Sequence, residues 1–255
     1  MDKVILGQTG LEVSRLSFGG IPFGGRGWRK DPYVPPEVAA KVLKRAFDLG
    51  INFWDTAERY GSYPHFREGL KLVNREKIIL STKTREESYE GAKTSIRNSL
   101  QELGTEYIDI YYLHFVNSLE SLEARRRGAL KALIEAKEKG LVRHIGLSTH
   151  RSNIVEKALE IPEIEVFMVK MNKIEERMQC TLKDMLKAAK KAYEKGKGIV
   201  VIKILAYGKL TVEEGLEWAL NLPFVHSVCL GIRTMQELEE DVEIYNKIMA
   251  KRRKG

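Results

Sequence analysis

The sequence predicts an α/β fold, a (β/α)8 TIM barrel, from three observations. Short apolar runs alternate with amphipathic stretches along the chain, which is the pattern of repeated β-α units around a parallel sheet. Eight such pairs can be counted. The length of 255 residues also matches the roughly 250 residues typical of an eight-stranded barrel. Since no linker or change of composition divides the chain, residues 1–255 are expected to form a single domain.

The first expected element is a β-hairpin ahead of the barrel. The segment VILGQTGLEV has an apolar run, a glycine-containing turn and a second short run, as in two antiparallel strands joined by a tight turn. The hairpin is expected to close the bottom of the barrel. The eight barrel strands are then expected at Leu16–Phe18, Asn52–Trp54, Ile78–Ser81, Ile108–Leu113, His144–Leu147, Val166–Val169, Ile199–Ile202 and Ser227–Leu230.

Glycines and capping residues mark the ends of the helices between these strands. Three amphipathic segments end on a glycine that suits the left-handed C-terminal cap. These glycines are Gly50, Gly104 and Gly140. Thr211 with Glu214, and Thr234 with Glu237, have the spacing of a capping box before the segments LEWAL and LEEDVEIY.

Composition and charge exclude several classes of function. The net charge is +8, but basic residues are interspersed with acidic ones and have no aromatic interleaving, so nucleic-acid binding is not expected. No apolar stretch approaches the roughly 20 residues that span a bilayer. The start MDKVILGQTG lacks the layout of a signal peptide, so a cytoplasmic location is expected. The two cysteines, Cys180 and Cys229, are far apart, and neither a disulfide nor a metal site is expected.

Four polar residues lie at or just beyond the ends of consecutive predicted strands. They are Asp55, Tyr60, Lys83 and His114, in the segments INFWDTAERYG, IILSTKT and IYYLHF. Neighbouring strands of a closed barrel bring such residues to one rim, where active sites of this fold are found. A phenol is a poor acid at pH 7, but a nearby ammonium lowers its pKa. Lys83 is expected to act so on Tyr60, with Asp55 orienting Lys83 and His114 positioning a carbonyl oxygen.

Other readings of these residues stay open. Taken singly, an aspartate after a strand is usually a turn residue, and a lysine or histidine at a rim is usually structural. A lysine on a barrel strand also suits a Schiff-base lyase or aldolase. Asp55 argues against that chemistry, because a charged partner keeps the amine protonated.

The segments around the four residues resemble the aldo-keto reductase superfamily. The similarity runs from LGQTGLEVSRLSFGG through GLVRHIGLSTH to SVCLGIRTMQELEED and includes DTAERYG, LSTKT and YYLH. The resemblance implies the eight-stranded barrel and NAD(P)H-dependent reduction of aldehydes or ketones to alcohols. It makes Asp55, Tyr60, Lys83 and His114 the catalytic tetrad, with Tyr60 as general acid.

The resemblance also implies positions for the nicotinamide cofactor. Ser148 matches a serine that grips the carboxamide, whereas Thr149 and Met168 replace the amide side chains usual there. Met168 is otherwise read as a core residue, and Lys170, on the same strand face, as a rim charge or a chain that reaches solvent. In IKILAYGKL the loop over the pyrophosphate would be formed by Leu205, Ala206, Gly208 and Leu210.

The last matching stretch, GIRTMQELEED, would receive the adenosine end of the cofactor. Arg233 is suited to pair with a 2′-phosphate, whereas Glu237 would repel one. The stretch also supplies Gly231, and Glu240 and Asp241 match a pair that contacts adenine. On balance NADP(H) is favoured as the cofactor, with NAD(H) possible.

The expected partner is a small-molecule carbonyl compound whose identity the sequence does not encode. Its specificity is expected to lie in three rim loops: 24–36 with Trp28 in the substrate pocket, Tyr63–Phe66 and Asn117–Ser121. The alternative function is a nicotinamide-binding redox sensor or regulatory protein with weak turnover. Neither membrane binding nor an oligomeric state is indicated.

Overall fold

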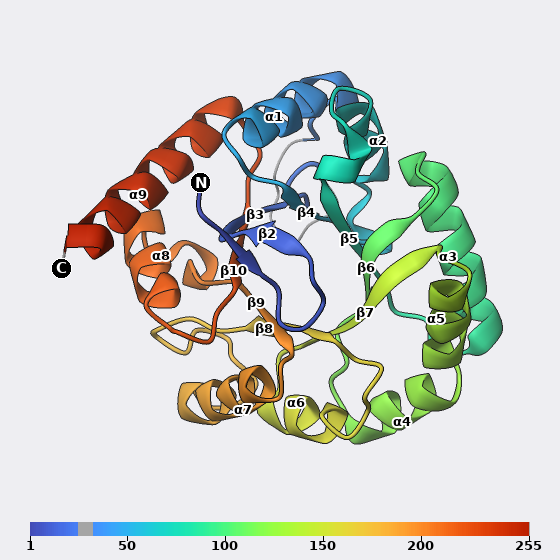
Figure 1. Ribbon diagram of the computed structural model, residues 1–255. Helices are drawn as coiled ribbons and strands as arrows, with labels where there is room; N and C mark the ends of the chain where they lie inside the picture. Colours follow the sequence, from blue (N-terminus) through green and yellow to red (C-terminus); the bar gives the residue numbers. More distant parts are fainter. Residues whose placement is uncertain (25–32, 255) are drawn as a thin grey trace.

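Eight parallel strands close into a barrel in the computed structural model, which describes residues 1–24 and 33–254 (Figure 1). Around the barrel the strands follow the order β10-β3-β4-β5-β6-β7-β8-β9. Their bounds are β3 (Leu16–Gly19), β4 (Phe53–Asp55), β5 (Ile79–Thr84), β6 (Ile108–Leu113), β7 (Val142–Thr149), β8 (Val166–Lys170), β9 (Gly198–Ile202) and β10 (Ser227–Gly231). Each overlaps its predicted segment, so the predicted barrel is confirmed.

Helices cover the outside of the barrel (Figure 1). They are α1 (Pro36–Asp48), α2 (Tyr63–Leu70), α3 (Tyr89–Leu103), α4 (Leu119–Arg127), α5 (Ala129–Glu138), α6 (Ser152–Ala158), α7 (Leu182–Glu194), α8 (Val212–Leu220) and α9 (Met235–Lys254), with short 3-10 turns η1 (Glu58–Tyr60), η2 (Arg75–Lys77) and η3 (Ala206–Gly208). The expected caps are present. Gly104 caps α3 in the left-handed conformation, and Thr211 and Glu214 form a capping box at α8.

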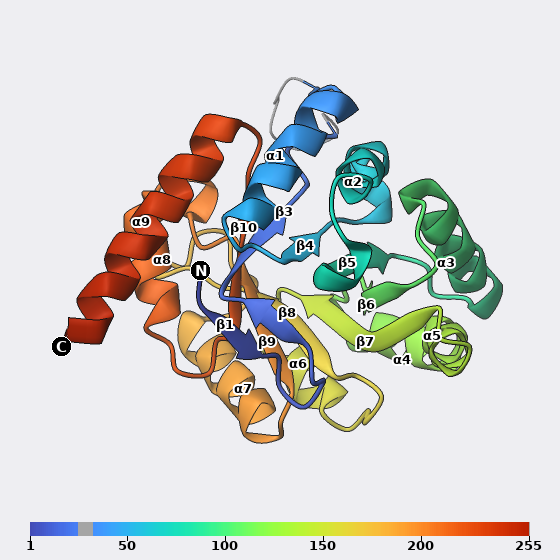
Figure 2. The same ribbon diagram turned by 45° about the horizontal axis from the view of Figure 1, so that its top comes forward.

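The N-terminal hairpin plugs one end of the barrel. Strands β1 (Lys3–Ile5) and β2 (Glu12–Ser14) pair antiparallel and lie across the centre of the barrel (Figures 1 and 2). The hairpin side chains of Leu6, Leu11 and Val13 are buried in one cluster with Phe53 and Ile110 of the barrel. The apolar interior is therefore sealed at this end, and the chemistry is confined to the carboxyl ends of the strands.

One expected rim loop is part of the core. Tyr63 begins α2, where Tyr63, His65 and Phe66 are buried. The Tyr63 hydroxyl forms hydrogen bonds with Thr82 and Ser99 at 2.7 and 2.9 Å. The prediction that Tyr63–Phe66 shapes substrate specificity was wrong, because Phe66 packs against Phe18 and Trp54 and the His65 ring is stacked on Phe23. Trp28 and residues 25–32 lie outside the described residues.

No helix in the described part of the chain is both long and apolar enough to cross a membrane.

Candidate active site

The four polar residues of the predicted tetrad meet at the carboxyl ends of three adjacent strands. Asp55 ends β4, Lys83 lies near the end of β5, and His114 follows β6. The register pairs Asp55 with Ser81 and places β6 beside β5. Tyr60 ends the turn η1 on the loop after β4. Strand pairing therefore brings together residues that are far apart in the sequence.

Asp55 and Lys83 form a buried ion pair. The Lys83 ammonium lies 2.7 and 2.6 Å from the two carboxylate oxygens of Asp55 and donates a third hydrogen bond of 2.7 Å to the Thr56 carbonyl. The Ser81 hydroxyl also donates to Asp55 at 2.6 Å. An ammonium has three donors, so those of Lys83 are directed at Asp55 and Thr56. The amine is therefore held charged in a fixed position.

Tyr60 stands beside this pair and beside His114. The Lys83 ammonium is 5.0 Å from the centroid of the Tyr60 ring, and the rings of Tyr60 and His114 meet edge to face with centroids 5.8 Å apart. Burial raises the pKa of the Tyr60 phenol and outweighs the lowering by Lys83. The expectation of a lowered pKa was wrong in its net sign, since burial penalises the phenolate more than the ammonium favours it.

The neighbouring groups have opposite shifts. Burial lowers the pKa of Lys83, but the charge and hydrogen bond of Asp55 together with the charge of Tyr60 outweigh it, so that pKa is raised overall. Burial, Lys83 and Arg85 hold the pKa of His114 well below its usual range. At neutral pH the site therefore combines an ammonium, a protonated phenol and a neutral imidazole.

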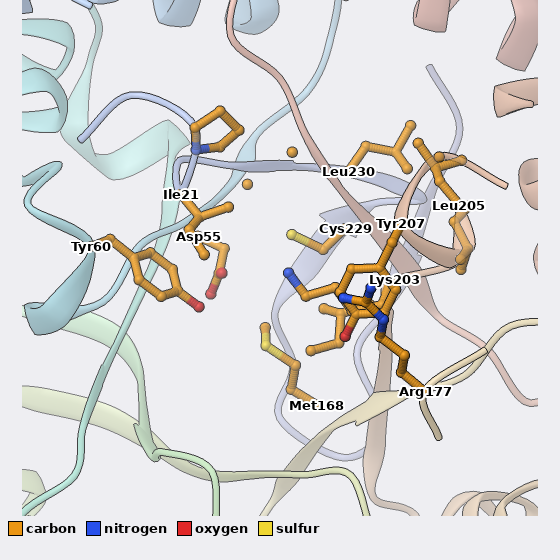
Figure 3. A pocket seen from close by; sticks show the side chains of 16 residues that line it. Ile21, Asp55, Tyr60, Met168, Arg177, Lys203, Leu205, Tyr207, Cys229 and Leu230 are labelled. Atoms are coloured by element: carbon orange, nitrogen blue, oxygen red, sulfur yellow. The ribbon is translucent and has the colours of Figure 1, made fainter. Parts of the chain in front are cut away.

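A cavity of about 310 Å³ opens beside Asp55 and Tyr60 (Figure 3). Its floor and walls include Gly19 of β3, Met168 of β8 and Gly231 of β10. Figure 3 shows Asp55 and Tyr60 on one side of the cavity and Lys203, Tyr207 and Arg177 on the other. The cavity thus joins a proton-donating side to a cationic side.

The eight predicted cofactor positions that precede Arg233 divide into two groups. Met168, Leu205, Gly208 and Gly231 line the cavity. Four others are not among its lining residues: Ser148, Thr149, Ala206 and Leu210. All four are buried, Thr149 and Ala206 completely. Ala206 and Leu210 therefore pack below the loop and do not present their side chains to a ligand.

Two hydroxyls expected at the carboxamide are engaged within the protein. The Thr149 hydroxyl donates to the Val116 carbonyl at 2.6 Å. The Ser148 hydroxyl accepts a hydrogen bond of 3.0 Å from the Phe115 amide. Met168 adds only a thioether and methylenes. Of these groups only the Ser148 hydroxyl keeps a hydrogen to donate, so polar recognition of a carboxamide is limited at this end of the cavity.

The residues at the start of α9 form an acidic group. The Glu237 carboxylate accepts from the amides of Arg233 and Thr234 at 2.7 and 3.3 Å, while the Thr234 hydroxyl accepts from the Glu237 amide at 3.1 Å. The predicted capping box is therefore present. Burial, with Glu237 and Glu240, raises the pKa of Asp241 to about 7. A 2′-phosphate placed here would meet several carboxylates.

Sequence reasoning missed three side chains that line the cavity: Arg177, Lys203 and Tyr207. Lys203 belongs to the segment IKILAYGKL that was predicted to form the loop over the pyrophosphate, which was an available signal. Tyr207 lies in the same segment, at φ 61°. Arg177 lies in the loop after β8, where nothing in the local sequence marks it.

These residues fit a nicotinamide dinucleotide. The apolar side chains of Met168 and Ile202, which line the same cavity as Tyr60, can receive a flat ring, and the cations Arg177 and Lys203 can receive phosphate groups.

Comparisons with known proteins agree with the fold. The profile of the Aldo/keto reductase family matches residues 15–217. The chain is 34% identical over 183 residues to the "Probable aldo-keto reductase 1" of Glycine max, covering 66% of this chain and 51% of that protein. It is 32% identical over 225 residues to the L-galactose dehydrogenase of Arabidopsis thaliana, covering 84% of this chain and 68% of that protein.

A solved structure is also similar over nearly the whole chain. The crystal structure of a Pseudomonas aeruginosa protein assigned to the aldo-keto reductases superposes with a TM-score of 0.82 at 28% identity, covering 97% of this chain and 95% of that one. Members of this family use nicotinamide cofactors. From the barrel, the convergent tetrad and the profile match over most of its length, the chain belongs to the aldo/keto reductase family.

Proposed function

We propose that this protein is an NAD(P)H-dependent oxidoreductase that reduces aldehydes or ketones to alcohols, with Tyr60 as general acid. The observation that carries the proposal is the buried Asp55–Lys83 pair beside Tyr60 and His114 at the edge of a cavity. Perturbed groups gathered at one cavity are typical of an active site. The family membership favours the same chemistry.

The side chains have complementary tasks in such a reduction. A bound reduced nicotinamide supplies the hydride, which no amino-acid side chain can provide. Tyr60 donates its proton to the carbonyl oxygen, and its raised pKa keeps that proton in place beforehand. The Lys83 ammonium then stabilises the phenolate that is left. The neutral imidazole of His114 donates a hydrogen bond that orients the oxygen.

The same geometry disfavours a Schiff-base mechanism. A lysine nucleophile must be neutral to attack a carbonyl, whereas the pKa of Lys83 is raised and its hydrogens are directed at Asp55 and Thr56. We therefore assign Lys83 to charge stabilisation.

The acidic residues at α9 bear on the choice of cofactor. The sequence favoured NADP(H), but burial, together with the charges of Glu237 and Glu240, already raises the pKa of Asp241 to about 7. An added 2′-phosphate would increase that repulsion. We propose that NAD(H) binds at least as tightly as NADP(H).

The test is stopped-flow oxidation of bound NADH and NADPH by a panel of aldehydes and ketones. Rapid oxidation by at least one carbonyl compound, with formation of the alcohol, is expected. Tight cofactor binding with slow oxidation of the bound cofactor by every compound would contradict the proposal of a reductase. It would favour a redox sensor, the function that the limited recognition of the carboxamide also favours.

A further inference from the structure

The ammonium of Lys83 lies beside a second phenol as well as beside Tyr60. Its nitrogen is 5.0 Å from the ring centroid of Tyr60 and 5.9 Å from that of Tyr112. Both distances are within the roughly 6 Å at which an ammonium is attracted to an aromatic ring. Because the hydrogens of this ammonium are directed at Asp55 and Thr56, the two rings are neighbours of the charge and not its hydrogen-bond partners.

Strand pairing places Tyr112 level with Lys83. The register pairs Lys83 of β5 with Tyr112 of β6, and Tyr112 in turn with Gly146 of β7. Side chains alternate between the two faces of a strand, so Tyr112 shares a face with Ile110. Both are buried in the cluster that the hairpin closes inside the barrel. The ring of Tyr112 therefore lies in the barrel interior, in the same layer as Lys83.

Gly146 provides the space for this ring. A Cβ atom at Gly146 would lie 2.3 and 2.4 Å from the Cδ1 and Cε1 atoms of Tyr112, whereas carbon atoms in contact are normally about 3.5–4.0 Å apart. Gly146 is not among the glycines with positive φ, so its backbone conformation does not require glycine. A glycine within a strand often marks the close approach of another group. Here that group is the Tyr112 ring, which is seated against the bare backbone of β7.

The two phenols differ in their access to a ligand. Tyr60 lines the cavity (Figure 3), whereas Tyr112 is fully buried and is not one of the lining residues. The Tyr112 hydroxyl has no hydrogen-bond partner in residues 1–24 and 33–254. Burial, with the nearby Asp55 and Cys229, raises its pKa well above the ordinary value. Tyr112 thus stays protonated and out of reach of a substrate, and its ring is the part that contacts the Lys83 ammonium.

We propose that Tyr112 is a positioning residue for proton transfer: its ring, seated against Gly146, holds the Lys83 ammonium beside Tyr60. This inference rests on the proposed function. The stem of a lysine is flexible, and a smaller side chain at position 112 would leave space into which the ammonium could move. The ammonium would then stabilise the phenolate of Tyr60 less well. The expected result is slower proton transfer with unchanged binding of the cofactor.

The first test needs no turnover. Proton–carbon NMR of the full-length protein detects the ε-methylene group of Lys83, identified by the loss of its signal in Lys83→Arg. Aromatic rings beside this group displace its proton resonance from that of a solvated lysine. Tyr112→Leu should move the resonance toward the solvated value, whereas Tyr112→Phe, which keeps the ring, should leave it in place. An unchanged resonance in folded Tyr112→Leu protein would overturn the inference.

The second test measures the rate at which a carbonyl compound oxidises bound NADH. Tyr112→Leu should lower this rate roughly tenfold without changing the Kd of NADH. Tyr112→Phe should keep the rate and melt no lower than the wild type, because it loses only an unpaired hydroxyl. Tyr111→Leu is the matched control. Tyr111 is an adjacent buried tyrosine that packs with the helices outside the barrel and pairs with Ser99 at 3.0 Å, so its loss should lower the melting temperature but not the rate.

A combined variant separates positioning from simple packing. Gly146→Ala alone should destabilise the protein, because the added methyl group would overlap the Tyr112 ring. Gly146→Ala with Tyr112→Leu should recover stability relative to Gly146→Ala alone, yet its rate should stay as low as that of Tyr112→Leu. Recovery of the rate together with the stability would show that the ring only fills space, and would overturn the inference.

A double-mutant cycle asks whether Tyr112 acts through Tyr60. In a Tyr60→Phe background, Tyr112→Leu should cause no further loss of rate, because the phenolate that the Lys83 ammonium stabilises is no longer formed. A further tenfold loss in that background would contradict the positioning role.

The positioning role and the reductase activity fail in different ways. If the wild type reduces a carbonyl compound and Tyr112→Leu changes neither the rate nor the Lys83 resonance, the positioning role alone is overturned. If the wild type reduces no carbonyl compound but Tyr112→Leu displaces the resonance, the reductase is overturned and Tyr112 remains the residue that positions Lys83. An unchanged resonance without any reduction overturns both.

Discussion

At the scale of single residues, the most consequential contact is the buried pair of Asp55 and Lys83. Both side chains are at most 5% exposed, and their charged atoms are 2.6 Å apart. Such a pair gains Coulomb energy but costs desolvation of both ions. The main role of the ion pair is therefore to fix the position of the Lys83 ammonium, 5.0 Å from the ring centroid of the proposed acid, Tyr60.

Removing one partner should be far worse for stability than removing both. Lys83→Met leaves the Asp55 carboxylate buried without its cation and should lower the free energy of unfolding by roughly 3–5 kcal/mol. Asp55→Asn combined with Lys83→Met should lose clearly less than the sum of the single changes. Urea unfolding of the three variants measures this coupling. Additive losses would show that the pair does not act as a unit.

The sequence was informative about which residues meet and uninformative about their environment. The tetrad could be predicted because each member follows an apolar strand segment, and strand pairing brings such positions together. The net pKa shift of Tyr60 could not, because it depends on how completely neighbouring loops bury the phenol. The burial of Lys170 was missed for the same reason, since Tyr207 and Arg177 come from other loops.

At the scale of elements, the start of α9 combines a good cap with crowded acids. Glu237 caps the helix through the amides of Arg233 and Thr234. Asp241 lies one turn further on, 8% exposed, beside Glu237 and Glu240. This end of the helix is therefore well formed but electrostatically unfavourable at high pH.

Asp241→Asn should stabilise the protein at high pH. The pKa of Asp241 is about 7 in the folded state against an ordinary 3.8, so the folded state binds more protons. The stability that this proton confers is full below the ordinary pKa and is lost as the pH rises through about 7. At pH values above 7 the free energy of unfolding of the variant should be on the order of 2 kcal/mol higher than that of the wild type.

The difference between Asp241→Asn and the wild type should vanish toward acid pH, as measured by thermal unfolding across the range. Glu243→Gln, an exposed position of the same helix, is the control and should change little at any pH. A constant difference at every pH would contradict the assigned pKa.

Prediction of elements succeeded where a local signal decides the structure. The strands were marked by apolar runs, and the caps by glycine and by the threonine–glutamate spacing. The start of α2 was misjudged because Tyr63, Pro64 and His65 resemble a loop, and their helical state depends on the burial of Tyr63 and Phe66. Tertiary packing overrides propensity in such short elements.

At the scale of the whole molecule, stability and chemistry are placed at opposite ends of the barrel. The hairpin fills the bottom with Leu6, Leu11 and Val13, while the tetrad and the cavity lie at the carboxyl ends of the strands. Changes at the bottom should therefore alter unfolding without altering the site.

Leu6→Ala tests this separation. Leu6 is fully buried, and its truncation should cost roughly 2–5 kcal/mol of unfolding free energy while leaving the affinity for NADH unchanged in the folded protein. Ile5→Ala, at the adjacent position that is 52% exposed, is the matched control and should stay within about 0.5 kcal/mol. A weakened cofactor affinity in folded Leu6→Ala protein would show that the two ends are coupled.

The central claim is that Tyr60 donates the proton in carbonyl reduction, and Tyr60→Phe tests it most directly. The variant keeps the ring beside His114 and Lys83 but has no proton to give. With the carbonyl compound that oxidises bound NADH fastest in the wild type, the stopped-flow rate should fall on the order of a thousandfold, while the Kd of NADH stays the same. An unchanged rate of oxidation in Tyr60→Phe would contradict the account.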